Sequence, residues 1–170
     1  MNQTQMKVAD EEQVARLVSQ EWVVDGVLQV AAFVQAPRET YLSVNRLSID
    51  SYSEDVRQFV KAHPKYYNAT DKSYMRALLD VAGIRTISIE VDELKVDANV
   101  EVEPRDVHTQ SHAGIFVRVK GRNVVPGRQL PNGHLPFNVS EEMLLQRVQW
   151  ELHDLAELQR QKLLHHQSKA

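Results

Sequence analysis

Hydrophobic and polar positions alternate strictly from Ile115 to Lys120, and this alternation predicts that the stretch from Ser111 to Lys120 is a β-strand with polar residues at its start. One face of the strand carries branched aliphatic residues and is expected to pack against the hydrophobic core. The other face carries an aromatic ring and two cations, which are Phe116, Arg118 and Lys120. Similar patterns predict four further strands, at residues 27–34, 40–48, 84–91 and 96–102.

Apolar residues recur at helical spacing in four other stretches of the chain. Ser51 and Glu54 have the spacing of a capping box, so a helix is expected from there to the His63-Pro64 pair. The other predicted helices cover residues 10–20, 75–82 and 140–164. Together these patterns predict an α+β fold. In it, a mostly antiparallel sheet is packed by several helices, and the C-terminal helix is long.

Length and composition predict one domain over residues 1–170. The chain is 42% hydrophobic and 25% charged, as in ordinary globular domains, and about 70% of the surface of such a chain is buried on folding. The polar stretch 1–9 is expected to be flexible. Residues 121–139 contain three glycines and three prolines together with apolar residues, which predicts an ordered loop.

The predicted C-terminal helix, residues 140–164, carries an apolar seam that suggests a partner. Leu145, Val148, Leu152 and Leu155 follow a three-four spacing that lasts about two heptads. We expect the first half of this helix to pack on the sheet and the second half to meet a second copy, which gives a homodimer. The alternative is a helix that packs wholly on its own domain.

Charge is unevenly distributed, although the net charge is only −3. Seven acidic residues lie between Glu90 and Asp106, whereas residues 107–140 contain no acid and include Arg118, Lys120, Arg122 and Arg128. Two interpretations stay open. The basic segment pairs with the acidic one inside the fold, or it binds an anionic partner.

Several classes of chemistry are excluded or unsupported. The chain has no cysteine, which excludes disulfides, thiolate zinc sites and cysteine nucleophiles and fits a reducing compartment. It has no apolar run of membrane-spanning length and no apolar signal core, so we expect a soluble, cytoplasmic protein without membrane contact. His108 and His112 are spaced like metal ligands, but no third ligand is identifiable, so neither a metal nor a cofactor is expected.

Four short motifs between Trp22 and Lys120 resemble those of a group of short uncharacterised bacterial proteins. They are Asp25-Gly26, Ala32-Phe33, the run from Leu42 to Arg46 and the run from Ser111 to Ala113. The group brings no established activity. The resemblance implies that Ser43, Asn45, Arg46 and His112 form a set, because polar residues at the ends of different strands can converge on one pocket.

The expected function is binding of an anionic ligand, either a nucleotide or a nucleic-acid phosphate, at a polar and basic pocket formed by strand ends. The candidate ligand-binding residues are Ser43, Asn45, Arg46, His112, Arg118 and Lys120. Two alternatives stay open. One is a homo-oligomeric protein-interaction module that uses the C-terminal helix, and the other is a small metal-independent enzyme with His112 as acid or base.

Overall fold

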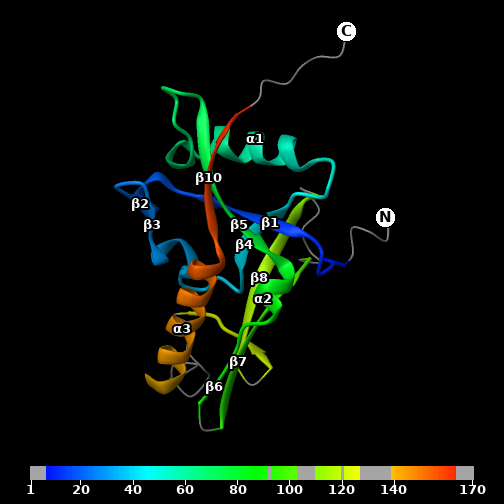
Figure 1. Ribbon diagram of the computed structural model, residues 1–170, viewed down its shortest axis with the longest axis vertical. Coiled ribbons are helices and arrows are strands. Elements are labelled where there is room, and N and C mark those ends of the chain that lie inside the picture. Colours follow the sequence, from blue (N-terminus) through cyan, green and yellow to red (C-terminus); the bar gives the residue numbers. More distant parts are fainter. Residues whose placement is uncertain (1–6, 92, 103–109, 120, 127–138, 164–170) are drawn as a thin grey trace.

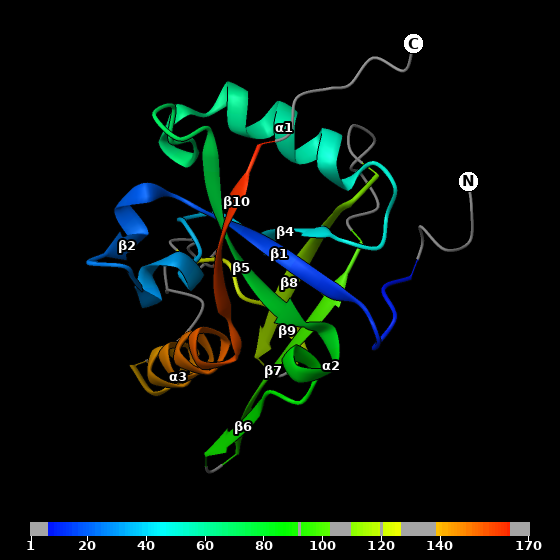
Figure 2. The same cartoon turned by 45° about the horizontal axis from the view of Figure 1, so that its top comes forward.

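An antiparallel sheet of eight strands dominates the fold (Figure 1). The computed structural model describes residues 7–91, 93–102, 110–119, 121–126 and 139–163. Seven strands follow the spatial order β10-β5-β1-β4-β8-β7-β6, and β9 pairs with β8. These strands are β1 Gln13–Val18, β4 Leu42–Arg46, β5 Ser73–Asp80, β6 Ser88–Val91, β7 Leu94–Glu101, β8 His112–Val119, β9 Arg122–Asn123 and β10 Glu157–Lys162. The sheet is strongly curled (Figure 2).

The remaining elements are short, apart from two helices. The described residues contain three α-helices, which are α1 Tyr52–Ala62, α2 Val81–Arg85 and α3 Val139–Leu155. Three single 3₁₀ turns are η2 Gln20–Trp22, η3 Val30–Phe33 and η4 Pro64–Tyr66. A separate hairpin joins β2 Val23–Val24 to β3 Val27–Leu28. Within the described part of the chain, no helix is long and apolar enough to cross a membrane.

The two long helices pack on opposite faces of the sheet, as the alternation of side chains along β1 makes clear. Val14 and Val18 belong to the larger core, which includes Val148 of α3, whereas Ala15 and Leu17 belong to a smaller core under α1. The two helices therefore lie on opposite sides of the sheet, in which β1 is the third of the seven strands in spatial order (Figure 2).

Two predicted helices are strands, because their apolar residues pack on both faces of the sheet. The predicted helix 10–20 contains β1, and the predicted helix 75–82 is β5 followed by the first residues of α2. Leu78 and Leu79, which are neighbours in sequence, enter different cores. A strand buried on both sides reads as a continuous apolar run, which periodicity alone cannot distinguish from a buried helix.

The predicted long C-terminal helix is also wrong, and with it the predicted fold class. α3 ends at Leu155, and the next residues form β10, which pairs with β5 in the register Leu158 to Ala77. Strand β10 satisfies backbone groups along the edge of β5, and the Gln159 side chain accepts two hydrogen bonds from Arg76. The molecule is thus a curled, mostly antiparallel sheet with three helices, rather than a sheet packed by several helices with a long one at the end.

The end of α3 at Leu155 removes the second half of the predicted helix 140–164, which was to meet a second copy. Val148 and Leu152 are fully buried in the core of their own chain, while Leu155 is 42% exposed at the end of α3. Residues 157–162, which belong to that second half, form β10 and pair with β5. The homodimer stays a prediction, but α3 no longer offers the surface that motivated it.

Other predicted elements are confirmed in part. Strands β4, β7 and β8 and helix α1 lie where the patterns placed them, but the predicted strand 27–34 is only β3 followed by η3. The predicted strand 84–91 begins inside α2 and becomes β6 at Ser88. Of the predicted flexible stretch 1–9, residues 1–6 lie outside the described residues, while Val8 is buried. Of the predicted loop 121–139, residues 127–138 lie outside the described residues. The assignment of residues 1–170 to a single domain stays a prediction.

Candidate functional site

A groove of about 860 Å³ lies in the described part of the chain. Its walls come from three strands, from α1 and η4, and from the segment between β1 and β4 that contains η2 and η3. The lining residues are Arg16, Leu17, Trp22, Ala31, Val34, Gln35, Ala36, Pro37, Glu39, Ser43, Asn45, Asp55, Phe59, Lys65, Tyr66 and His112. Both its volume and its mixture of apolar and polar walls are typical of sites for small organic molecules.

Three of the predicted site residues meet on the wall that the sheet provides. Ser43 and Asn45 share one face of β4, and Asn45 lies directly opposite His112 in the antiparallel register with β8. The Tyr41 ring contacts the His112 ring at 5.7 Å between centroids and the Phe116 ring at 5.1 Å. The structure thus brings Ser43, Asn45 and His112 together in one groove.

A hydrogen-bond network fixes α1 against this wall. One carboxylate oxygen of Asp55, Oδ2, accepts bonds from the Ser51 hydroxyl at 2.9 Å, the Ser111 hydroxyl at 2.6 Å and the Ser111 backbone N–H at 3.1 Å. Ser111 Oγ in turn accepts a bond from Asn45 Nδ2 at 2.9 Å. Ser51 therefore caps no backbone group, and the predicted capping box is replaced by a tertiary contact between α1, β4 and the start of β8.

Three aromatic rings also line the groove. The Phe59 ring of α1 and the Trp22 ring each meet the Tyr66 ring edge-on, with centroids 5.1 Å and 6.1 Å apart. The ammonium group of Lys65 lies over the Tyr66 ring, 5.4 Å from its centroid. A flat apolar body can pack against these rings while a cation stands beside them.

Arg16 is a functional candidate that the sequence patterns missed. Strands β1 and β4 pair only at two positions, Val14–Arg46 and Ala15–Asn45. Beyond them, the Arg16 side chain links the two strands, because its Nη1 donates a hydrogen bond to the Ser43 carbonyl at 2.9 Å. Its Nε donates to the Ala32 carbonyl at 2.5 Å. The available signal was a lone cation inside the apolar run from Val14 to Val18.

Arg16 is a buried cation without an ion pair. The side chain is only 8% exposed, and no carboxylate pairs with it among the residues that the structure describes. Its guanidinium lies 5.4 Å from the centroid of the Trp22 ring. Burial lowers the pKa of Arg16, and the more distant Tyr66 and Glu39 offset this only in part.

Arg46 lies outside the groove and forms a structural ion pair. Its Nε and Nη2 each donate to a different oxygen of Glu12 at 2.8 Å, and the Arg46 side chain is only 2% exposed. Burial raises the pKa of the Glu12 carboxyl, but hydrogen bonds from Arg46, Ala9 N–H and Ser48 outweigh it and lower the pKa below its ordinary value. Arg46 therefore stabilises the N-terminal segment against β4.

Arg118 also has a structural partner. Its Nη1 and Nη2 donate to the two carboxylate oxygens of Glu101 on β7, with a distance of 3.1 Å for the Nη2 bond. For this residue the internal pairing of the basic and acidic segments is confirmed. The hydrogen bond from Arg118 dominates the pKa of Glu101 and lowers it despite partial burial. Lys120, the last predicted site residue, lies outside the described residues.

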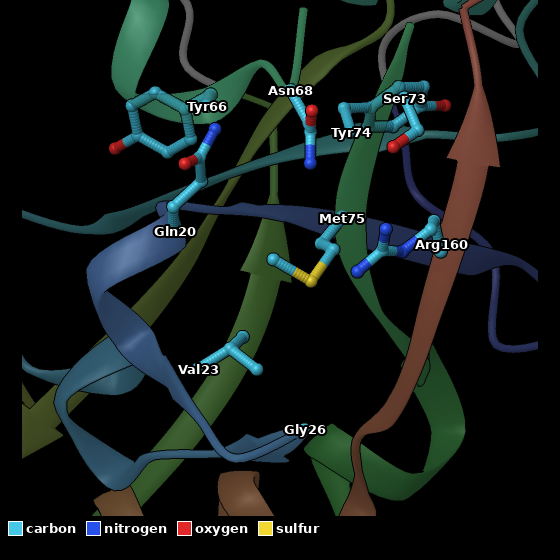
Figure 3. A pocket seen from close by; sticks show the side chains of 9 residues that line it. All are labelled: Gln20, Val23, Gly26, Tyr66, Asn68, Ser73, Tyr74, Met75 and Arg160. Atoms are coloured by element: carbon cyan, nitrogen blue, oxygen red, sulfur yellow. The ribbon is translucent and has the colours of Figure 1, made fainter. Parts of the chain in front are cut away.

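A second cavity, of about 280 Å³, lies near the hairpin and β10 (Figure 3). Met75 and Val23 face its middle, and Arg160 and Gln20 approach it from different elements (Figure 3). Arg160 Nη1 forms an ion pair with Asp71 Oδ2 at 2.7 Å, and the side-chain amide of Gln20 donates a hydrogen bond to the Tyr67 carbonyl at 2.5 Å. Arg160 and Gln20 thus both have partners within the fold.

Metal ligands do not gather in the part of the chain that is described, where no group of three or more His, Asp or Glu residues could hold an ion. His108, one half of the spaced histidine pair, lies outside that part. Comparisons with protein families, with curated proteins and with solved structures find no match to this chain, so its resemblance to short bacterial proteins stays a prediction.

Proposed function

We propose that this chain is a small binding domain and that its groove takes an organic anion with a flat apolar body. The observation that carries the proposal is the convergence of Ser43, Asn45 and His112 with three aromatic rings around one cavity of about 860 Å³. Such a combination of aromatic walls with a few polar groups is typical of sites for small molecules.

The contacts suggest how the ligand lies. Its flat body packs against Trp22, Phe59 and Tyr66, which provide apolar area at little entropic cost. The Ser43 hydroxyl is exposed in the groove and offers a hydrogen-bonding group to the ligand. Lys65 adds positive charge beside Tyr66 and favours an anion over a cation.

The expected phosphate site on the basic segment receives less support. Arg46 is paired with Glu12, and Arg118 is paired with Glu101, so two of the predicted cations already have carboxylate partners. A polyphosphate or a nucleic-acid backbone needs several cations together. We therefore favour a small organic anion over a nucleic acid. The role of His112 as an acid or base stays a prediction.

The proposal is tested with two fluorescent probes of similar shape. Anilinonaphthalene sulfonate carries one negative charge, whereas N-phenylnaphthylamine is neutral. Titration of the folded protein should give saturable enhancement of anilinonaphthalene sulfonate fluorescence, with weaker binding of the neutral probe. Ser43→Trp should abolish this signal, because Ser43 is exposed in the groove and an indole there blocks access to the wall that Ser43 shares with Asn45.

Trp150→Ser is the matched control. Trp150 is an aromatic residue of α3 that is 53% exposed and does not line the groove, so its removal should leave probe binding unchanged. Folding of both variants is checked by near-ultraviolet circular dichroism. Loss of binding in Trp150→Ser together with retention in Ser43→Trp would assign the probe to the surface of α3 and refute the groove.

A further inference from the structure

Arg16 differs from three other buried or half-buried arginines, each of which has a carboxylate partner, and from Arg76 of β5, which has none among the described residues but donates to the side chains of Gln159 and Tyr52. Arg46 pairs with Glu12, Arg85 with Asp10 and Arg118 with Glu101. Arg16 is more deeply buried than Arg85 or Arg118, yet within the described ranges it contacts only backbone carbonyls and an aromatic ring.

An unpaired buried cation is unfavourable, because the protein interior solvates charge less well than water does. Carbonyl dipoles and the Trp22 ring compensate part of the lost hydration. The lowered pKa of Arg16 has the same origin, since burial disfavours its charged form. A negative charge delivered by a ligand would complete the site.

The guanidinium keeps a suitable edge for such a charge. It carries five N–H groups, of which one on Nε and one on Nη1 are donated to the Ala32 and Ser43 carbonyls. The remaining N–H of Nη1 and both of Nη2 have no partner among the described residues. The edge between Nη1 and Nη2 matches the two oxygens of a carboxylate, which arginine binds in a bidentate manner. Because Arg16 lines the groove, a ligand there can reach it.

The other charged groups of the groove favour a single negative charge on the ligand. Asp55 and Glu39 also line the cavity, so a dianion such as a phosphate monoester meets two like charges. Lys65 offsets one of these charges from its position beside Tyr66. A monoanion is therefore neutralised by Arg16 without excess repulsion.

We propose that the ligand is an aromatic monocarboxylate and that Arg16 determines this specificity by a bidentate contact, with Trp22 packed beside both. This inference rests on the proposed function of the groove and adds the chemical class of its ligand. It predicts that the carboxylate, rather than negative charge in general, is recognised.

The test uses three matched compounds and the wild-type protein. 2-Naphthoate, 2-naphthamide and 2-naphthyl phosphate share one ring system and differ in the polar group. Each is titrated by calorimetry and used to displace anilinonaphthalene sulfonate. Naphthoate should bind about tenfold or more tighter than the neutral amide, as expected for hydrogen bonds to a charged group, and tighter than the phosphate.

Arg16→Lys provides the second measurement, because it keeps the charge and removes the planar fork. It should weaken naphthoate binding about tenfold while leaving naphthamide binding unchanged. If this variant fails to fold, the wild-type series alone decides.

The outcomes separate this inference from the function on which it rests. Equal displacement of the probe by naphthoate and naphthamide, or tighter binding of the phosphate, overturns the role of Arg16 and leaves the groove as a binding site. Failure of all three compounds to displace a probe that Ser43→Trp also leaves bound overturns both.

Discussion

Replacing Glu12 by glutamine tests whether the buried pair of Glu12 and Arg46 holds the N-terminal segment to the sheet. Glu12 Oε1 accepts hydrogen bonds from Arg46 Nε and the Ser48 hydroxyl, and Oε2 accepts from Arg46 Nη2 and the Ala9 N–H. A glutamine amide presents donors where one of these oxygens stood. Two of the four hydrogen bonds are then lost, and the buried Arg46 guanidinium loses its ion pair with Glu12.

The expected cost is about 3 kcal/mol, at the lower end of the range for breaking a buried ion pair, because the Glu12 side chain keeps 11% exposure. With a urea dependence of about 2 kcal/mol/M, the unfolding midpoint should fall by about 1.5 M. Asp10→Asn is the matched control. Asp10 is 65% exposed and its partner Arg85 keeps three other acceptors, so the cost should stay below about 1 kcal/mol.

The pH dependence has a defined sign. Because the pKa of Glu12 is lowered in the folded protein, its contribution is fully present above the ordinary pKa of 4.5 and is lost as pH falls through the folded pKa. Glu12→Gln lacks this contribution at every pH. The difference in unfolding free energy between wild type and variant, measured by urea denaturation, should be constant near neutral pH and shrink in acid.

Two results would refute this reasoning. Equal destabilisation by Glu12→Gln and Asp10→Asn would mean that burial does not distinguish the two pairs. A difference between wild type and Glu12→Gln that stays unchanged on acidification would mean that the charge of Glu12 does not stabilise the fold.

Three further predictions concern the sheet. A Cβ atom on Gly114 would lie 2.6 Å from the Tyr41 ring, so Gly114→Ala should lower the free energy of unfolding in urea by about 1–3 kcal/mol. The control Gly83→Ala, whose Cβ would have its nearest atom at 3.4 Å, should be tolerated, and equal effects of the two substitutions would contradict this prediction. Burial raises the pKa of Tyr74, so the unfolded chain loses the Tyr74 proton before the folded protein does, and the free energy of unfolding should fall as pH rises above about 10. Tyr74→Phe should show a smaller fall, and an alkaline profile identical to that of the wild type would exclude this cause. Truncation after Ala156 removes β10 and uncovers the edge of β5, so the melting temperature by circular dichroism should drop, and an unchanged value would show that β10 is dispensable.

Local pattern was sufficient where one face of an element meets the core and the other meets polar surroundings. In β7, Val96, Ala98 and Val100 are buried and alternate with half-buried polar residues. Helix α1 follows from an apolar stripe and from Pro64, which cannot continue it. These elements could be predicted because their period is unambiguous.

Local pattern failed where tertiary neighbours decide the conformation. β1 and β5 are covered on both faces, so their apolar runs carry no strand period. The segment after Leu155 continues the helical spacing of leucines, but its backbone pairs with the edge of β5. Its Gln159 side chain also accepts hydrogen bonds from Arg76 of β5. The energy of that pairing is absent from the isolated segment.

The candidate site divides in the same way. The sequence by itself determined that Ser43 and Asn45 share a strand face and that His112 begins another strand, because strand geometry alternates side chains. Only the tertiary structure decided that β4 pairs with β8, which brings Ser43, Asn45 and His112 together. It also decided that Arg46 and Arg118 form ion pairs with carboxylates. It also placed Arg16 unpaired at the groove. Long-range strand pairing chooses the partners of each polar group, and no local pattern encodes that choice.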